Sequence, residues 1–171
     1  MIKSNILNFV VKLKTHIKSF WFIYILVALL AITFAKNFRL GFNLSPSLPG
    51  TVYLISLGTE PEPDMPFAFS WNDPKNQTPY RDGVTFIKLA AGVPGDFVMQ
   101  KDGRIELKNW SLEPKTTSRK GKRLEATEFL GVIPEGHFFA AGVHKDSLDS
   151  RYKMVGLITQ DRVIGKAYEL F

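Results

Sequence analysis

The feature that most constrains this chain is an uncharged, apolar run near its N-terminus. Phe20–Ala35 reads FWFIYILVALLAITFA and is framed by Lys18 and Lys36. As an α-helix this run would be about 24 Å long, slightly short of the roughly 30 Å hydrocarbon layer of a bilayer. Flanking lysines can extend such a helix by reaching toward the membrane surface. We therefore predict a transmembrane anchor over residues 19–36.

The charges around this run predict its orientation. Four lysines precede it and two basic residues follow it: Lys3, Lys12, Lys14 and Lys18 before, Lys36 and Arg39 after. An excess of Lys and Arg marks the cytoplasmic side of a membrane helix, so residues 1–18 should be cytoplasmic and residues 37–171 extracytoplasmic. A cleaved signal peptide is the alternative. Its apolar core is normally shorter, and no small-x-small cleavage site follows the run.

The basic character of the chain is confined to this N-terminal part. Residues 1–36 hold five lysines and no acid, whereas residues 37–171 hold 17 Lys+Arg against 16 Asp+Glu, so +5 of the net charge of +6 lies in the first part. The basic balance therefore gives no reason to expect nucleic acid as a partner. Cysteine is absent, which excludes disulfides, thiol catalysis and cysteine zinc sites.

One lysine stands in apolar company in the middle of a predicted strand. Val84–Ala91 is bounded by Asp82-Gly83 and by Gly92-Val93-Pro94-Gly95-Asp96, which suits a type II turn. Alternation places Lys88 on the face that also carries Val84, Phe86 and Ala90. A buried lysine without a partner has a lowered pKa and can serve as a general base. The alternative is an edge-strand lysine whose ammonium reaches water.

Two further segments gather the polar residues that a reactive site needs. Asn43–Gly50, NLSPSLPG, is a stiff loop with two serines between prolines. Gly142–Tyr152, GVHKDSLDSRY, follows an apolar strand and contains Ser147, Asp149 and Arg151. The carboxylate and guanidinium of this segment can pair and brace the loop.

The rest of the chain predicts a mainly β domain. Aromatic residues alternate along the short predicted strand Phe67–Trp71. We expect their side chains in the core, and exposure to lipid or to an extended peptide is the alternative. The basic segment Lys115–Arg123 is expected to be a solvated loop, with contact to acidic lipid or substrate as the alternative. The predicted strands besides Val84–Ala91 are Thr51–Leu57, Phe67–Trp71, the hairpin Phe97–Gln100 with Arg104–Leu107, and His137–Val143.

Three of these segments resemble the motifs of the signal peptidase I superfamily of serine–lysine membrane proteases. Ser45-Pro46-Ser47-Leu48 is similar to its S-x-S-M segment. Lys88–Asp96 is similar to K-R-V-V-G-L-P-G-D. Ser147–Tyr152, with Ile164–Ala167 downstream, is similar to S-x-D-S-R-Y…V-G-K-A. The three segments stand in the family order behind the expected anchor, which makes the resemblance far more specific than any one of them.

The resemblance implies a signal-peptidase-like β domain and a role for each matching residue. Ser47 would be the nucleophile and Lys88 the general base. The Ser45 hydroxyl and the Ser47 backbone N–H would bind the oxyanion, Ser147 would orient the lysine amine, and Asp149 and Arg151 would brace the site. Neither a cofactor nor a metal is implied. The partners would be the lipid bilayer and a membrane-embedded precursor protein, with the catalytic domain on the periplasmic side of a bacterial inner membrane.

Departures from the general pattern favour one subgroup. Pro49 stands two residues after Ser47 instead of three, Leu48 replaces a methionine, and Gly142-Val143-His144 replaces Gly-Asp-Asn. Compact domains with these features resemble the TraF-type peptidases of conjugative plasmid transfer. Those enzymes mature a pilin precursor, and some join its new ends into a ring. A general signal peptidase I that removes secretory signal peptides is the alternative.

Two interpretations from other classes stay open at this point. A serine–histidine hydrolase could use His137 or His144 with Asp146 or Asp149, although neither histidine lies near a G-x-S-x-G segment. A non-enzymatic assembly protein of the transfer apparatus would need neither Ser47 nor Lys88.

Overall fold

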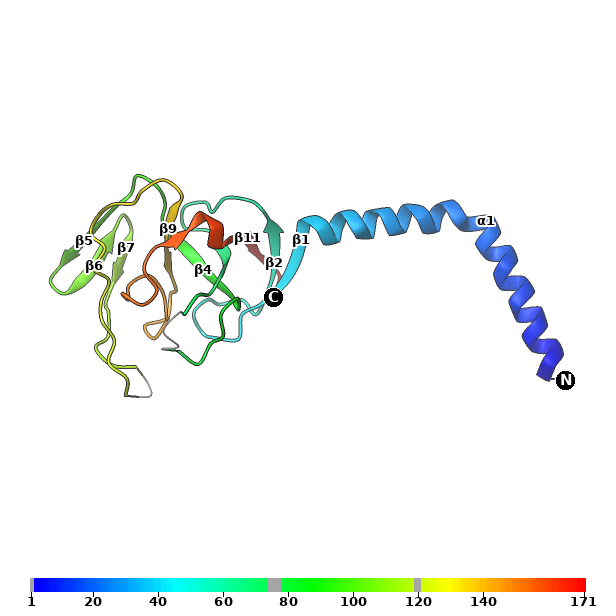
Figure 1. Cartoon of the computed structure of the whole chain (residues 1–171), viewed down its shortest axis with the longest axis horizontal. Helices are drawn as coiled ribbons and strands as arrows, with labels where there is room; N and C mark the ends of the chain where they lie inside the picture. Colours follow the sequence, from blue (N-terminus) through cyan, green and yellow to red (C-terminus); the bar gives the residue numbers. More distant parts are fainter. Residues whose placement is uncertain (1, 74–77, 119–120) are drawn as a thin grey trace. The chain divides into compact units, whose positions relative to one another are not determined.

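The computed structural model describes residues 2–73, 78–118 and 121–171. The chain divides into two units, an N-terminal helix that ends at Asn37 and a β domain that begins at Phe38 (Figure 1). Because the two units form separate bodies, each is described by itself.

The first unit is a single long helix, α1 (Ile2–Asn37). Phe20 interrupts it with non-helical backbone angles, φ −117° and ψ 15°. The part Asn8–Asn37 is long and apolar enough to cross a membrane, and none of it is buried inside the protein. This part contains the whole of the predicted span, residues 19–36.

The β domain is built on a seven-stranded antiparallel sheet. Its strands run in the order β1-β2-β11-β3-β4-β9-β10. A second, four-stranded antiparallel sheet has the order β7-β6-β5-β8 and lies beside the first (Figure 1). Its strands come between β4 and β9 in the sequence. The strands of the large sheet are β1 (Phe38–Phe42), β2 (Val52–Leu57), β3 (Pro66–Ser70), β4 (Thr85–Gly92), β9 (His137–Ala141), β10 (Ile158–Thr159) and β11 (Val163–Glu169). Those of the small sheet are β5 (Phe97–Lys101), β6 (Arg104–Leu107), β7 (Trp110–Leu112) and β8 (Gly131–Val132).

The strand that carries the lysine is an interior strand. β4 lies between β3 and β9, so both of its edges are hydrogen-bonded. The turn after it is the predicted one: the Asp96 N–H donates to the Val93 carbonyl oxygen at 3.0 Å, and Gly95 has φ +88°. The alternative of an edge-strand lysine is therefore wrong.

The last strand, β11, is the largest feature of the sheet that the sequence did not predict. It lies between β2 and β3 and is hydrogen-bonded to both, so the C-terminal end of the chain completes the sheet that begins at the start of the domain. Gly165 makes this possible, because its φ is +154° and a Cβ there would stand 1.8 Å from the Ser56 carbonyl oxygen. A short 3₁₀ turn, η1 (Gln160–Arg162), leads into the strand. The short strands β1, β7, β8 and β10 were not predicted either.

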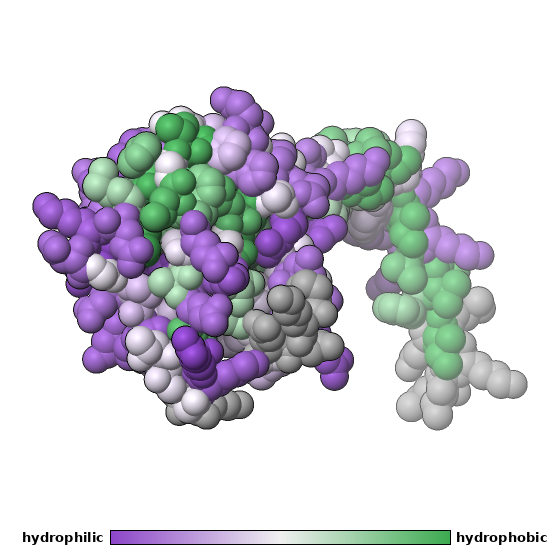
Figure 2. Space-filling model, turned by 60° about the vertical axis from the view of Figure 1, so that its left-hand side comes forward, coloured by the Kyte–Doolittle hydropathy of each residue, from purple (hydrophilic) through white to green (hydrophobic). Residues whose placement is uncertain are grey.

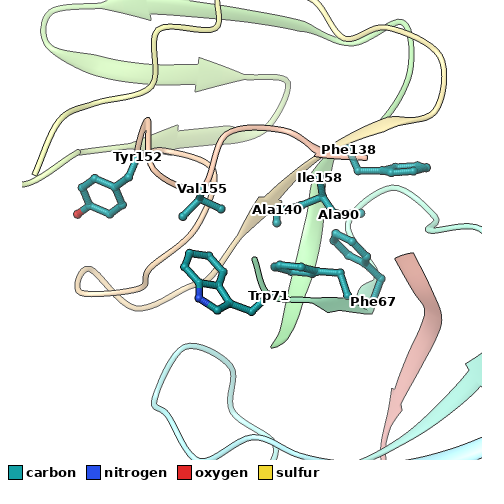
Figure 3. Close-up of a cluster of buried hydrophobic side chains, with 9 residues drawn as sticks. Phe67, Trp71, Ala90, Phe138, Ala140, Tyr152, Val155 and Ile158 are labelled. Carbon is teal, nitrogen blue, oxygen red and sulfur yellow. The ribbon is translucent and has the colours of Figure 1, made fainter. Parts of the chain in front are cut away.

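The alternating aromatic strand forms the centre of the core. Phe67, Phe69 and Trp71 are almost fully buried, so their predicted place in the core is confirmed and exposure to lipid or peptide is excluded. Figure 3 shows Phe67 and Trp71 in one cluster with Ala90 of β4, with Ala140 of β9, and with side chains from the loop that precedes β11. This packing fixes β4 and β9 against each other where the site is formed.

The predicted basic loop is a hairpin-like turn. The backbones of Thr117 and Arg123 pair as an isolated bridge, and Lys115 binds the carboxylate of Asp146. Arg119 and Lys120 lie outside the described residues, so the prediction of a solvated segment is tested only in part.

Candidate active site

The serine loop is shaped by one asparagine. The Asn43 side-chain amide donates to the carbonyl oxygens of Leu48, at 3.1 Å, and Gly50, at 3.0 Å. Its Oδ1 accepts a hydrogen bond from the Ser45 hydroxyl at 3.1 Å. These bonds close the loop that the prolines stiffen, and they fix where both serines point. Asn43 is a site residue that no local sequence pattern predicts.

The two serines of this loop are in direct contact. Ser45 Oγ and Ser47 Oγ are 2.8 Å apart, a hydrogen bond in which either hydroxyl can be the donor. Ser47 is only 3% exposed, whereas Ser45 is on the surface. The Ser47 carbonyl oxygen accepts the N–H of Val143 at 2.9 Å, which ties the loop to the end of β9. Within the described residues, no acceptor takes the Ser47 N–H.

Lys88 is buried in the middle of β4, with 5% of its surface exposed. Burial lowers the pKa of Lys88 to about 8, an effect that the charge of Asp149 opposes and that of Arg151 reinforces. Its Nζ lies 5.8 Å from the centre of the Phe86 ring, and Phe67 is its partner on β3. Val84, expected to shield the lysine, precedes the strand and is 40% exposed, so that expectation is wrong. No described residue accepts a hydrogen bond from Nζ, which leaves the amine available.

Gly142 is the point at which the serine loop, the lysine strand and the C-terminal segment meet. Leu89 pairs with Ala141, so the antiparallel register places Gly142 next to Lys88. A Cβ on Gly142 would lie 3.0 Å from the Ser47 carbonyl oxygen and 2.2 Å from Ser147 Oγ. Glycine is therefore required for this close approach. Ser47 and Ser147 thus approach Gly142 from two separate stretches of sequence, and the register of β4 with β9 makes Lys88 the next residue of β4 on the Gly142 side.

Ser147 is buried, and its predicted role of orienting the Lys88 amine stays a prediction. It is 4% exposed, and its hydroxyl has no hydrogen-bond partner among the described residues. A buried hydroxyl without a partner is rare because its desolvation is not compensated. Its placement beside Gly142, and hence beside the lysine strand, makes an amine or a bound ligand a fitting partner.

Asp149 and Arg151 hold the end of β9 in place. The Asp149 carboxylate binds the guanidinium through two hydrogen bonds, at 2.7 Å to Nε and 2.9 Å to Nη2. The same carboxylate accepts the Gly142 N–H at 2.9 Å, and Arg151 Nη2 donates to the Gly142 carbonyl oxygen at 3.0 Å. Ser150 adds a bond from the Ala140 N–H to its hydroxyl, at 3.0 Å. The backbone of Gly142 is therefore fixed on both sides.

Replacing Arg151 by methionine should destabilise the whole β domain. Asp149 is fully buried, so removing the guanidinium leaves an uncompensated carboxylate in the interior. Breaking a buried pair in this way costs roughly 3–5 kcal/mol. The measurement is the thermal midpoint of the full-length protein in detergent, with Arg104→Met as the control because Arg104 forms its ion pairs on the surface. Equal midpoints for the two variants would contradict the bracing role.

The histidines are engaged elsewhere. His144 Nδ1 accepts the Asp146 N–H at 3.1 Å, and His137 Nδ1 lies 2.9 Å from the Glu135 carbonyl oxygen. In the part of the chain that the structure describes, neither ring forms a hydrogen bond with Ser47. Because Asp149 is bound to Arg151 and Asp146 is bound to Lys115, the geometry gives a serine–histidine hydrolase no support.

A cleft of about 670 Å³ opens beside the site. Ser147 is one of its lining residues, together with apolar side chains and several charged ones: Tyr80, Leu148, Tyr152, Met154, Lys115, Arg123 and Asp146. A second hollow of similar volume, around residues 116–126, contains none of the site residues. Of these two hollows, the first is the one lined by a predicted site residue, Ser147, whereas Ser47 and Lys88 line neither of them.

Comparison with known proteins identifies the family of this chain. A model of the family described as signal peptidase, peptidase S26, matches residues 13–171, and the chain belongs to this family. Signal peptidase I of Bacillus licheniformis is 32% identical over 96 residues, a match that covers 52% of this chain and 51% of that protein. The match therefore spans about half the length of that relative. The crystal structure of a signal peptidase I from Enterococcus faecalis V583 is 27% identical and has a TM-score of 0.40, with 63% of this chain and 97% of that chain covered.

The family assignment confirms the resemblance of the three motifs to signal peptidase I, and the structure itself confirms the expected mainly β fold behind one apolar helix. Together, the helix and the family indicate a membrane-anchored protein.

Proposed function

We propose that this protein is a membrane-anchored serine endopeptidase in which Ser47 is the nucleophile and Lys88 the general base. The observation that carries the proposal is the burial of Lys88 beside Gly142, which contacts the Ser47 loop. A serine hydroxyl is a weak nucleophile and needs a base nearby. Burial lowers the pKa of Lys88, so a substantial fraction of its amine is neutral near neutral pH and can accept a proton, as histidine does in other enzymes.

The reaction begins when the neutral Lys88 amine takes the Ser47 proton as Oγ attacks the scissile carbonyl carbon. The resulting oxyanion accepts hydrogen bonds from the Ser47 N–H and from the Ser45 hydroxyl. Lys88 then returns the proton to the leaving amine as the peptide bond breaks. The acyl-enzyme on Ser47 is resolved by water, or by a substrate amine that reaches the ester.

Asn43 is a positioning residue in this scheme. Its Oδ1 can only accept, so it holds the Ser45 hydroxyl from one side while Ser47 Oγ contacts it from the other. The one proton of the Ser45 hydroxyl is thus directed to Asn43 in the resting site, and Ser45 Oγ accepts from Ser47. To donate to the oxyanion, the Ser45 hydroxyl has to rotate away from Asn43.

The substrate in this proposal is a membrane-exported precursor protein, as for the family, and the sequence features favour a conjugative pilin. The support is the Ser45-Pro46-Ser47-Leu48-Pro49 loop, closed by Asn43, and the histidine ahead of the Ser147–Tyr152 segment. General removal of secretory signal peptides is the second candidate, and the relative from Bacillus licheniformis favours it.

Intact-mass analysis of co-expressed precursors separates these outcomes. A candidate pilin precursor and a secretory preprotein are each expressed with the wild-type chain or with Ser47→Ala. We expect shortening of the pilin, dependent on Ser47, and little change of the preprotein. A product lighter than the cleaved linear pilin by one water shows that the acyl-enzyme was resolved by the pilin's own amine. Cleavage of the preprotein alone would overturn the pilin assignment and leave the peptidase assignment intact.

The orientation in this proposal places the N-terminus in the cytoplasm and residues 37–171 in the periplasm of a bacterial inner membrane. The lysines before the span support it. Protease added outside spheroplasts should degrade the β domain and leave the N-terminal part protected. Protection of the β domain with digestion of the N-terminus would reverse the orientation.

A further inference from the structure

The first half of α1 carries an apolar face that is exposed within the described part of the helix. Ile6, Phe9, Leu13 and Ile17 follow one another at intervals of three or four residues, so they share one side of the helix. They are 58%, 67%, 46% and 48% exposed. An apolar stripe of this kind normally packs on a partner, because exposed apolar area of this size is unfavourable in water.

The remaining faces of the same segment carry mostly polar and positively charged residues, with the exposed Val11 as an apolar exception. Asn8, Thr15 and Ser19 lie on the side away from the apolar face, and three lysines, Lys12, Lys14 and Lys18, stand at its flanks. No acidic residue occurs anywhere in residues 1–36. Figure 2 shows hydrophilic and apolar side chains side by side along the helix. The segment is therefore amphipathic and cationic.

The backbone breaks where this pattern ends. Phe20 has φ −117° and ψ 15°, whereas a regular helix has about −63° and −42°. Its ring lies 4.7 Å from that of His16. The part after the break, residues 21–37, measures about 25 Å as a helix and carries no charge before Lys36, so with Lys36 reaching the membrane surface it can cross a bilayer without the residues before the break. Three lysines within seven residues before the break are incompatible with the centre of a bilayer.

We propose that residues 6–19 form an in-plane helix that binds the surface of a bilayer through anionic phospholipid headgroups. The apolar face would enter the boundary between headgroups and acyl chains, and the lysines would contact the lipid phosphates. The break at Phe20 would redirect the chain from the membrane plane into the spanning segment. The occupant is an anionic lipid surface because the segment has only positive charges and continues directly into the membrane helix.

The test uses the full-length chain, which has no cysteine and so accepts single cysteines without background. Positions 9–19 are changed to cysteine one at a time, spin-labelled, and reconstituted in vesicles of phosphatidylcholine with phosphatidylglycerol. The accessibility of each label to oxygen, which concentrates in the acyl chains, is compared with its accessibility to a water-soluble nickel chelate. We expect a periodicity of about 3.6 residues, with Phe9→Cys, Leu13→Cys and Ile17→Cys in lipid and Thr15→Cys in water.

The control variant exchanges two neighbours, Lys12→Leu with Leu13→Lys, and so keeps both charge and composition. It places a lysine on the apolar face, and labels at Phe9 and Ile17 should lose their oxygen accessibility. In vesicles of phosphatidylcholine alone, the periodic pattern of the wild-type sequence should weaken. A depth that changes steadily from position 9 to 19 would show a continuous span and overturn the proposal. Uniform exposure to the chelate, or equal patterns in the two kinds of vesicle, would also overturn it.

Discussion

Ser47→Ala and Lys88→Met should each abolish precursor cleavage, with kcat/KM falling by a factor of about 10⁴ or more. The first variant removes the atom that attacks, and the second removes the group that accepts its proton. Because the two act in one step, the double variant should be no slower than either single one. The measurement is cleavage of a precursor-derived peptide by full-length protein in detergent.

Matched controls test whether such losses are specific. Ser111→Ala and Lys101→Met change the same residue types at exposed positions of the small sheet and should keep wild-type rates. Ser47→Ala removes one buried oxygen atom and should keep the fold, as measured by the thermal midpoint. Cleavage by Ser47→Ala within tenfold of the wild-type rate would refute the assignment of the nucleophile. A loss in His144→Ala as deep as in Ser47→Ala would favour the histidine alternative.

Activity should rise with pH through the pKa of Lys88, which burial lowers to about 8. The base must be neutral, so kcat/KM should increase about tenfold per pH unit below that value and level off above it. About a tenth of the amines are then neutral at pH 7, against roughly one in 3,000 for an ordinary lysine. Lys88→Arg should be inactive at every pH, because a guanidinium does not give up its proton in this range. A wild-type pH profile in Lys88→Arg would show that Lys88 is not the base.

The lowered pKa of Lys88 also predicts how the stability of the protein changes with pH, which can be measured without an activity assay. The folded protein binds this proton more weakly than the unfolded chain, so burying protonated Lys88 lowers stability. The cost is complete below pH 8, declines between pH 8 and 10.5, and is absent above that, with a limit of roughly 3 kcal/mol. Lys88→Met should therefore have the higher thermal midpoint at pH 7, and this advantage should shrink at alkaline pH. An advantage that is constant with pH would contradict a lowered pKa.

Local patterns in the sequence were sufficient for the features that depend on neighbouring residues. The apolar run needs only its own length to predict a helix that can span a membrane. Val93–Asp96 forms the predicted turn because Pro and Gly fix the backbone angles locally. Alternation along Phe67–Trp71 identified a core strand, and the order of the three motifs identified the family. Each of these properties is written within a few consecutive residues.

Only the tertiary structure decided whether Lys88 is a buried amine or a surface cation. The strand is the same in both cases, and the difference lies in β3 and β9, which pair with its two edges from distant parts of the chain. Gly142 and Asn43 escaped notice for the same reason. Gly142 is needed because Ser47 and Ser147 approach it, and Asn43 matters through bonds that exist only once its loop is closed. Burial and close approach are properties of pairs of segments, whereas a sequence pattern records one segment at a time.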